Sequence, residues 1–506
     1  MSNSGGECRR LAAAIAVTSR TTLHRAITTT IRALASAFLL LFCNERAAGD
    51  DVAAGPLFSK FELTLESGRR TEVLGPLFYS QSYGEVSQWA LPPLMSYTQD
   101  RGVDSTEFDI LYPLLTYDRF GSEYRFQIFQ LFNFAGGQMQ NETNKHRFSL
   151  FPIYLQQRSA DPSQNYTSLL PLYGRLQNRF FRDEVFYVMM PLYVHSRKRD
   201  VVTENFVFPI FHLRHGNGLK GWQFWPLAGH EHKVLTTVTN TWDDVLEVPG
   251  HDRKFVLWPF FLNQWAGLGT TNEEHTQAII PFYSFTRSPL RDATSVPFVL
   301  GWSSVHDRGK KYDEIGAPWP LVVFRRGETA HTTRVWPFYS RATNEFLEST
   351  WYMWPVYKYN RVHSDPLDRD RMRILLYLYS DIIERNTETG RALRRRDFWP
   401  LFTHRRDWNG NERLQILAPI EPILPNNKSI ERNYSPLWSL WRDEKNAQTG
   451  ARSQSLLWNL YRRETGTNGS RTAVLFGLVE NSSTGEGAQW RLFFWPNKKA
   501  ASARTD

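Results

Sequence analysis

A short phrase recurs along most of this chain: a bulky apolar residue, then Pro, then another bulky residue and usually an aromatic one. It reads Leu-Pro-Leu-Tyr at Pro171, Trp-Pro-Phe-Tyr at Pro337 and Trp-Pro-Leu-Phe at Pro400. Aligned on Pro, there are 22 copies, at positions 76, 93, 113, 130, 152, 171, 191, 209, 226, 259, 281, 297, 320, 337, 355, 377, 400, 419, 436, 459, 477 and 496. Gln130, Tyr377, Asn459 and Gly477 replace Pro in four of them. Such a repeat constrains the architecture far more than the chemistry.

The residues around the phrase indicate strands. Stretches such as 186–193 and 350–359 are rich in β-branched and aromatic residues and lack the i, i+3, i+4 pattern of a helix. Turn signals such as Asn409-Gly410 and Thr449-Gly450 lie between the clusters. We therefore expect each repeat to be one strand of about ten residues plus one turn, with successive strands antiparallel. The one long gap between copies, from Pro226 to Pro259, predicts an extra excursion at 234–248.

Proline within a strand removes a ladder hydrogen bond, so its repeated position predicts a bend, a bulge or a non-hydrogen-bonded site in every strand. Because every strand carries the same phrase, the strands should be equivalent. This favours an all-β antiparallel meander of about 22 repeated strands, closed or nearly closed into a large β-barrel, which also removes exposed sheet edges. The alternative is a layered β-repeat or a propeller-like array.

The N-terminus has the order of a secretory signal. Five Arg, at positions 9, 10, 20, 25 and 32, precede a largely apolar stretch at 33–43, and small residues follow at 47–49. We expect a signal region at 1–49, a single β-repeat domain at 50–498 and a polar tail at 499–506. Other interpretations are lipid modification of Cys43, a twin-arginine signal at Arg9-Arg10, and an organelle transit peptide.

Composition adds two constraints. Both cysteines, Cys8 and Cys43, lie in the expected leader, so the mature chain would have no thiol and no disulfide. Removing residues 1–49 takes away six Arg and two Glu, which leaves 54 basic and 49 acidic side chains, a net charge of +5. The basicity of the whole chain is therefore largely a property of the leader, and nucleic acid is not an expected partner.

Two groups of side chains are candidates for binding. Basic residues follow many phrases, at Arg175, Arg197 to Arg199, Arg214, Arg287, Arg325-Arg326, Arg361, Arg405-Arg406, Arg442 and Arg462-Arg463. They are interpreted either as solvated strand ends, neutralised by acids such as Asp407, Asp443, Glu444 and Glu464, or as rim groups that bind phosphates of lipid or an anionic polymer. Six histidines lie close together in sequence, at 195, 212, 215, 230, 232 and 251, and His230 and His232 would share one face of a strand. With only Glu231 and Asp252 nearby, the set of metal ligands is incomplete, so no metal site is predicted.

No nucleophile elbow, phosphate loop, zinc helix or dinucleotide fingerprint is present, so we expect no enzyme, no catalytic residue and no small-molecule cofactor. The leader, the thiol-free mature chain and the aromatic strands resemble a bacterial outer-membrane β-barrel, which implies a pore, an export conduit or a structural component of the envelope. The chain departs from that pattern in its short apolar clusters and its polar tail at 500–506. The alternative is a soluble secreted or periplasmic protein that binds an anionic envelope polymer, lipid or another protein. The expected localisation is the cell envelope, at the outer membrane, with membrane lipid or an envelope polymer as partner.

Overall fold

The structure is a computed structural model that describes residues 57–137, 145–239, 244–298, 300–467, 469–484 and 487–493. Residues Val52–Pro496 belong to one compact unit. The expected leader at 1–49 and the tail at 499–506 lie outside the described residues.

Strands dominate the unit, and most of them are five or six residues long. The first half contains β1 (Phe58–Glu62), β2 (Gly68–Val73), β3 (Phe78–Tyr83), β4 (Val86–Leu91), β5 (Met95–Asp100), β6 (Ser105–Ile110), β7 (Leu115–Phe120), β8 (Glu123–Ile128), β9 (Phe132–Gly137), β10 (Lys145–Leu150), β11 (Tyr154–Ser159), β12 (Tyr166–Leu169), β13 (Tyr173–Arg179), β14 (Arg182–Val188), β15 (Tyr193–Lys198), β16 (Val201–Phe206), β17 (Phe211–Gly216), β18 (Leu219–Phe224), β19 (Ala228–Lys233), β20 (Thr236–Thr239), β21 (Val245–Val248) and β22 (Gly250–Val256). The second half contains β23 (Phe261–Leu268), β24 (Glu274–Ile279), β25 (Tyr283–Arg287), β26 (Arg291–Val296), β27 (Trp302–Asp307), β28 (Tyr312–Gly316), β29 (Val322–Gly327), β30 (His331–Val335), β31 (Tyr339–Thr343), β32 (Leu347–Tyr352), β33 (Tyr357–Ser364), β34 (Leu367–Ile374), β35 (Tyr379–Asn386), β36 (Ala392–Phe398), β37 (Phe402–Arg406), β38 (Glu412–Ile416), β39 (Trp441–Lys445), β40 (Arg452–Leu456), β41 (Tyr461–Gly466), β42 (Gly469–Val474), β43 (Val479–Thr484) and β44 (Gly487–Leu492). The helices are the 3-10 turns η1 (Gly75–Leu77) and η2 (Pro162–Gln164) and the α-helices α2 (Lys428–Asn433) and α3 (Ser435–Trp438).

The predicted all-β antiparallel meander is confirmed. Forty-two strands form one sheet in which each strand pairs with the next along the chain, and β19 pairs directly with β22. The skipped strands β20 and β21 form a separate hairpin, which confirms the extra excursion expected at 234–248. The expected number of about 22 strands was wrong, because each repeat of the phrase contains a hairpin of two short strands rather than one long strand.

The prolines do not lie within the strands, and here the sequence-based expectation was also wrong. The phrase at Pro191 forms the tight turn 189–192 between β14 and β15, in which the Leu192 amide donates to the Met189 carbonyl at 2.8 Å. The peptide bond before Pro191 is cis, as in turns with proline at the third position. Where Pro is missing, two or three successive residues take positive φ instead, as Leu457, Trp458 and Asn459 do at 39°, 53° and 67°. Both kinds of turn reverse the chain within a few residues. The prolines therefore remove no hydrogen bond from the pairing of the strands.

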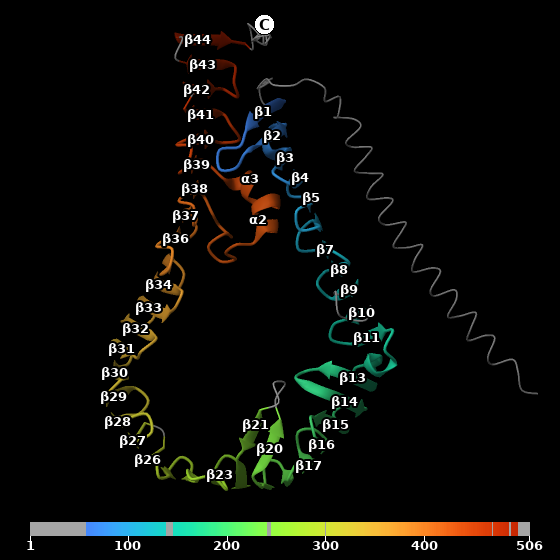
Figure 1. Cartoon of the computed structure of the whole chain (residues 1–506), viewed down its shortest axis with the longest axis vertical. Coiled ribbons are helices and arrows are strands. Elements are labelled where there is room, and N and C mark those ends of the chain that lie inside the picture. Colours follow the sequence, from blue (N-terminus) through green and yellow to red (C-terminus); the bar gives the residue numbers. More distant parts are fainter. Residues whose placement is uncertain are drawn as a thin grey trace, which may run out of the picture. The chain divides into compact units, whose positions relative to one another are not determined.

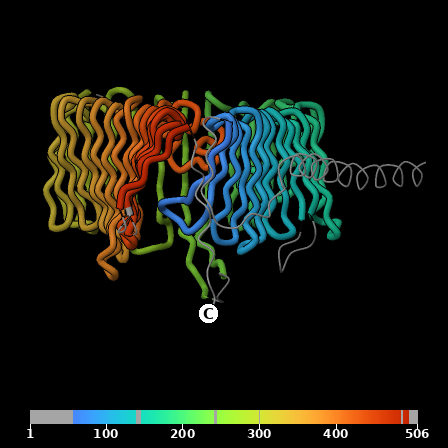
Figure 2. The backbone as a smooth tube through the Cα atoms, turned by 90° about the horizontal axis from the view of Figure 1, so that it is seen from above, coloured from blue at the N-terminus to red at the C-terminus, as the bar shows by residue number. Residues whose placement is uncertain are grey.

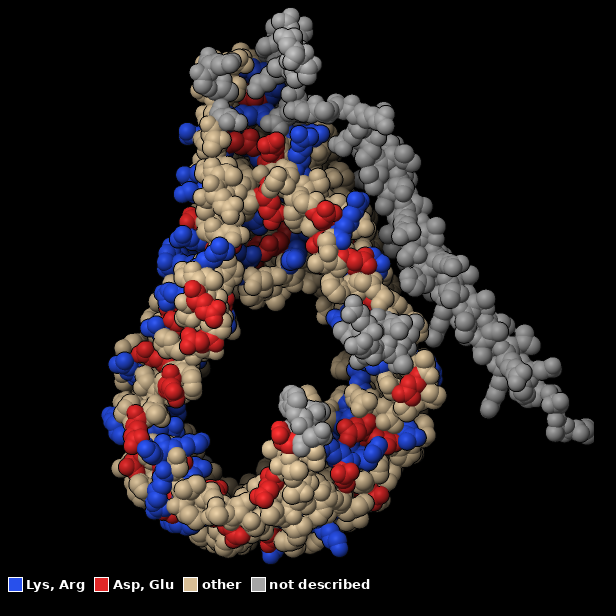
Figure 3. Space-filling model, in the orientation of Figure 1, with Lys and Arg blue, Asp and Glu red and all other residues tan. Residues whose placement is uncertain are grey.

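The sheet is therefore a strip with two unlike edges. One edge, the phrase edge, consists of the turns that contain the repeated phrase, and the opposite edge consists of polar turns and longer loops. In Figure 2 the phrase edge lies along the upper side, where the turns reach similar heights, while the β20–β21 hairpin projects from the lower side. Figure 3 views the polar edge, over which acidic and basic side chains are spread side by side.

The strip is not closed by strand pairing: among the described residues, β1 and β44 have no pairing partner on their outer sides. The barrel, expected to be closed or nearly closed, is an open meander: β1 meets β41 and β42 through side chains, and β43 and β44 continue beyond this contact (Figure 1). The Arg462 guanidinium lies 3.4 Å from the centre of the Phe61 ring, and the Asn459 amide donates to Glu72 at 2.6 Å. A hydrogen-bonded seam would need β1 beside β44, whereas here β1 lies against the face of β41 and β42.

A second set of contacts between the ends comes from residues 417–440, named here the clasp. It contains α2 and α3 and replaces the turn between β38 and β39, which still pair with each other. The copies of the phrase at Pro419 and Pro436 begin and end this segment, so the ordinary strand expected between them was wrong. The clasp contacts β3, β5 and β6 through Arg432, which links residues more than 300 positions apart in the chain.

Candidate functional site

Apolar side chains are concentrated at the phrase edge. The cross-strand pair next to each turn consists of two apolar or aromatic residues, from Val73 with Phe78 at β2–β3 to Val474 with Val479 at β42–β43. The exception is β28–β29, where Gly316 pairs with Val323. We name the phrase turns together with these pairs the apolar band.

The apolar band lies on the outer face of the sheet. Side chains alternate between faces along a strand, and the clasp contacts the inner face through residues such as Tyr79 and Asp109. The band residues Phe78 and Ile110 are their direct neighbours in the chain and so point the opposite way. Many band residues pack ring against ring across strands, for example Tyr193 with Phe206 at 5.3 Å and Tyr352 with Tyr357 at 5.7 Å between centroids.

This packing leaves the band largely exposed. Trp258, Trp336 and Trp354 in the turns expose 48%, 45% and 49% of their surface. The inner face offers no large core to cover them, since the buried cluster there comprises Leu155, Tyr166, Leu176 and Tyr187. A continuous exposed apolar surface of this length marks an interaction site rather than scattered surface residues.

The band is shallow over most of its length. On β4–β10 a second row of outward-facing aromatic residues follows the first pair, made of Trp89, Tyr97, Phe108, Tyr117, Phe126, Phe134 and Phe148. Many later strands carry polar residues at this position, such as Glu204, Lys254 and Asp381. A tight turn plus up to three strand residues corresponds to a depth of roughly 10 Å at about 3.3 Å per residue.

The clasp is held on the first strands by a buried ion network. Arg432 of α2 donates to Asp109 at 2.8 Å and to Thr98 at 2.9 Å, and it also pairs with Glu107. Its exposed fraction is 5%, and that of Asp109 is 1%. Neighbouring carboxylates offset the desolvation of the guanidinium and raise the pKa of Arg432. Two tyrosines add hydrogen bonds, from Tyr79 to the Arg432 carbonyl at 3.0 Å and from Tyr434 to the Tyr112 carbonyl at 2.5 Å.

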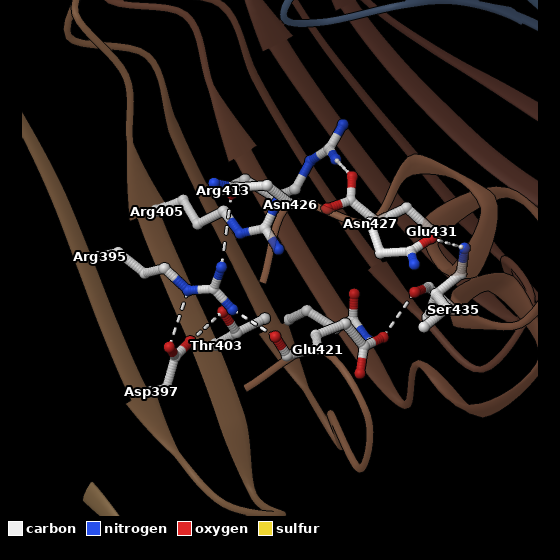
Figure 4. Close-up of polar contacts among 12 residues, drawn as sticks. Arg395, Asp397, Thr403, Arg405, Arg413, Glu421, Asn426, Asn427, Glu431 and Ser435 are labelled. Atoms are coloured by element: carbon white, nitrogen blue, oxygen red, sulfur yellow. Dashed lines mark hydrogen bonds and ion pairs between the residues drawn. The ribbon is translucent and has the colours of Figure 1, made fainter. Parts of the chain in front are cut away.

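Polar contacts also hold the clasp to the later strands (Figure 4). Arg395 of β36 donates to Asp397 at 2.7 Å and to the carbonyl of Glu421, while Arg405 of β37 pairs with Glu431 of α2. The Glu421 carboxylate accepts from Ser435 at 2.5 Å. Because α2 contacts both ends of the strip, its side chains hold the two ends together.

Between the clasp and the two ends of the strip lies a cavity of about 340 Å³, the clasp cavity. Its walls come from β2–β6, from α2 and from the inner face of β38–β41. The lining is mostly polar and contains side chains of both charges.

The arginines that follow the phrases do not gather at rims. All but Arg199, which lies in the turn after β15, belong to strands and are divided between the two faces: Arg442 and Arg462 face inward into the clasp cavity, whereas Arg463 faces outward and is exposed. Several make the expected acidic contacts, such as Arg462 with Glu464 at 2.6 Å. Asp443 and Glu444 pair instead with arginines outside the predicted set, Arg452 and Arg413.

The six histidines lie on β15, β17, β19 and β22, and those of β19 and β22 are divided between the two faces of the sheet. His230 and Asp252 lie 2.5 Å apart on the outer face, and His251 and Glu231 lie 2.7 Å apart on the inner face. Burial lowers the pKa of His251. Among the residues that the structure describes, no group of three or more His, Cys, Asp or Glu side chains is arranged to hold a metal ion.

Within the described ranges, no helix is long and apolar enough to cross a bilayer. No protein-family model matches this chain, and no curated protein sequence matches it. Function is therefore inferred from the chain's own residues, chiefly from the apolar band.

The clasp was missed at the sequence level, although one local signal was present. Asn427 caps α2 by accepting a hydrogen bond from the Ile430 amide at 3.0 Å, and Asn is a preferred residue at a helix N-terminus. The spacing of 17 residues between Pro419 and Pro436 masked this signal, because it matches the ordinary repeat.

Proposed function

We propose that this protein is an envelope component that binds a lipid surface by inserting its apolar band into the interfacial region of one leaflet. The observation that carries the proposal is the continuous row of exposed apolar residues along one edge, whereas exposed apolar residues on the polar edge, such as Phe181 and Phe346, occur singly or in short groups. The opposite edge is charged (Figure 3). The strip is thus amphipathic across its width.

The chemistry of the band supports lipid as the occupant. Tryptophan and tyrosine are enriched where membranes meet water, because their rings are apolar and their N–H and O–H groups remain hydrated. The turns Trp258-Pro259-Phe260, Trp336-Pro337-Phe338 and Trp354-Pro355-Val356 present such rings at one edge. A protein partner would need a complementary surface that follows the whole edge, whereas a bilayer supplies such a surface without specific shape.

The depth of the band favours insertion of an edge over spanning. Interfacial elements bury their apolar side about 5–10 Å into the boundary between headgroups and acyl chains, and a spanning barrel carries an apolar band about 25 Å tall. A six-residue strand such as β15 extends about 20 Å, and its outer face becomes polar after Tyr193, at His195 and Arg197. The strip therefore fits one leaflet better than a whole bilayer.

The secretory leader expected at 1–49 would direct the mature chain to the envelope, where the outer membrane offers such a lipid surface. The absence of a recognised catalytic motif in the sequence favours a structural or conduit role over an enzymatic one. The binding of lipid is inferred from the apolar band alone and does not depend on the leader or on the missing motifs.

The test is flotation of the mature protein, residues 50–506, with phosphatidylcholine vesicles. Wild type should float with the vesicles. A triple variant, Trp258→Ser, Trp336→Ser and Trp354→Ser, should lose at least 100-fold in partition coefficient, since each half-buried ring contributes on the order of 1 kcal/mol. The matched control is Phe181→Ser with Phe346→Ser, which removes exposed aromatic rings from the polar edge, where Phe181 is 95% exposed.

Depth is measured by quenching tryptophan fluorescence with lipids brominated at shallow or deep acyl positions. Stronger quenching by the shallow label supports edge insertion, whereas strong quenching by the deep label would favour a spanning barrel. Absence of flotation, or equal losses in the band and control variants, would refute lipid binding. A stable dimer whose association depends on the same three tryptophans would assign the band to a second copy instead.

A further inference from the structure

One arginine in the clasp cavity has no acidic partner. The other arginines that line the cavity each form an ion pair: Arg70 with Glu72, Arg413 with Glu444, Arg432 with Asp109 and Arg462 with Glu464. Among the described residues, the Arg442 side chain takes part in no hydrogen bond and no ion pair. The cavity therefore contains a guanidinium whose donors are available to a ligand.

On one side of Arg442 the neighbouring strands add further donors, while Gln415 lies in register on the other side. On the inner face, Arg442 of β39 pairs in register with Ser455 of β40, which pairs with Arg462 of β41. Paired strands lie about 4.8 Å apart, so the serine is flanked by an arginine on each side. The Ser455 hydroxyl has no hydrogen-bond partner in the described part of the chain.

The guanidinium of Arg442 is buried but not directly paired. Burial lowers the pKa of Arg442, the guanidinium groups of Arg413 and Arg70 add to this, and the carboxylates of Glu444 and Glu72 act in the opposite direction without forming an ion pair with it. The planar fork of a guanidinium matches the oxygen geometry of phosphate, and a hydroxyl provides a further donor. The cavity, at about 340 Å³, also has the volume of a small-ligand pocket.

We propose that the clasp cavity binds a phosphate group, with Arg442 and Ser455 as its principal ligands. The group is carried either by a lipid headgroup or by a small soluble phosphate ester. Arg442 is the second residue of β39 and so lies close to the phrase edge, at the end of the cavity nearest to a bound lipid surface. The site does not depend on the proposed function, because the cavity lies on the inner face and the apolar band on the outer face.

The test is calorimetric titration of the mature protein with inorganic phosphate and with glycerol phosphate, with sulfate as a competitor. Wild type should bind, Arg442→Gln should weaken binding at least tenfold, and Ser455→Ala should weaken it several-fold. The control, Arg463→Gln, removes an exposed arginine from the outer face of β41 and should leave binding unchanged. Ser455→Ala keeps the test informative if Arg442→Gln fails to fold, because this hydroxyl supports no internal contact.

Vesicle flotation separates the two sources. If the ligand is a headgroup, Arg442→Gln should reduce binding to vesicles that contain phosphatidic acid while binding to pure phosphatidylcholine is kept. If the ligand is a soluble ester, Arg442→Gln should float with both kinds of vesicle as wild type does, while its affinity for phosphate in the titration is reduced. No heat of binding with either phosphate, or equal weakening by Arg442→Gln and Arg463→Gln, would overturn the site. The titration measures phosphate binding in solution. It therefore gives a result for the clasp cavity whether or not the apolar band binds vesicles.

Discussion

Substitution of Arg432 by Met tests whether the clasp holds the two ends of the strip together. Arg432 and Asp109 are both almost completely buried and lie 2.8 Å apart, so removing the guanidinium leaves the Asp109 carboxylate without its cation. Loss of one partner of a buried pair costs about 3 to 5 kcal/mol, more than the exposed pairs of this protein can contribute. Met keeps much of the arginine's apolar volume, so lost packing adds little.

At the lower value of about 3 kcal/mol, the population of molecules with an undocked clasp should rise on the order of 100-fold. Hydrogen exchange read by mass spectrometry should show this as faster exchange in α2 and in β4–β6, with β29–β32 unchanged. The control is Lys311→Met, which breaks an exposed 2.9 Å pair with Glu328. The double variant Arg432→Met with Asp109→Asn should recover part of the loss, because the orphaned negative charge is removed. Exchange in β4–β6 no faster than in the Lys311 control would refute the role given to the clasp.

Three further changes test a close contact in the sheet, the cap of α2 and the buried histidines. Gly174→Ala should destabilise β13–β14 by about 1 to 3 kcal/mol in urea unfolding, because its Cβ would lie 2.5 Å from the buried Tyr187 ring, whereas Gly466→Ala, with open space around it, should be tolerated. Asn427→Ala should lower the free energy of unfolding by about 1 kcal/mol and loosen α2, because the Ile430 amide loses the side chain that accepts its hydrogen bond. Unchanged hydrogen exchange of the α2 amides would contradict this. Burial lowers the pKa of His212, His251 and His404, so the unfolded chain binds more protons than the folded one. The stability contributed by these neutral histidines should therefore be complete above the ordinary histidine pKa of about 6.5 and should fall as the pH drops through the lowered folded values. Replacing all three by Gln should make the thermal unfolding midpoint depend less on pH between pH 8 and 5.

The repeat and its turn signals were sufficient to predict an antiparallel all-β meander, and the long spacing after Pro226 to predict the β20–β21 excursion. They did not separate strand from turn, because a phrase such as Leu-Pro-Leu-Tyr is as apolar as a strand. The length of the repeat contained the missing information: 16 to 23 residues accommodate two six-residue strands and two reversals. The five consecutive bulky residues from Phe398 to Phe402 are explained in the same way, since they surround a turn at the edge of the sheet and do not alternate along one strand.

The candidate sites were harder to predict, for a physical reason. The contact between Arg432 and Asp109 spans 323 positions and depends on how strongly every intervening hairpin bends. The free donors of Arg442 become apparent only when the partners of Arg70 and Arg413 are known. The sequence did single out Arg442 as one of many basic residues, but it offered no means of ranking it above Arg463.

The contact of β1 with β41 and β42 has a consequence for how such a chain could change in length. A hydrogen-bonded cylinder closes only when strand number, stagger and tilt agree, so gaining or losing one hairpin would put every pairing at the junction out of step. Here the junction consists of ring, guanidinium and amide contacts between overlapping surfaces, as between Arg462 and Phe61, and these do not require a particular register. Each additional hairpin lengthens the perimeter by roughly 10 Å, two strand spacings, and leaves the width of the strip unaltered. The circumference of this architecture is therefore adjustable in single-repeat steps by duplication or deletion within the gene, with the overlap absorbing the difference.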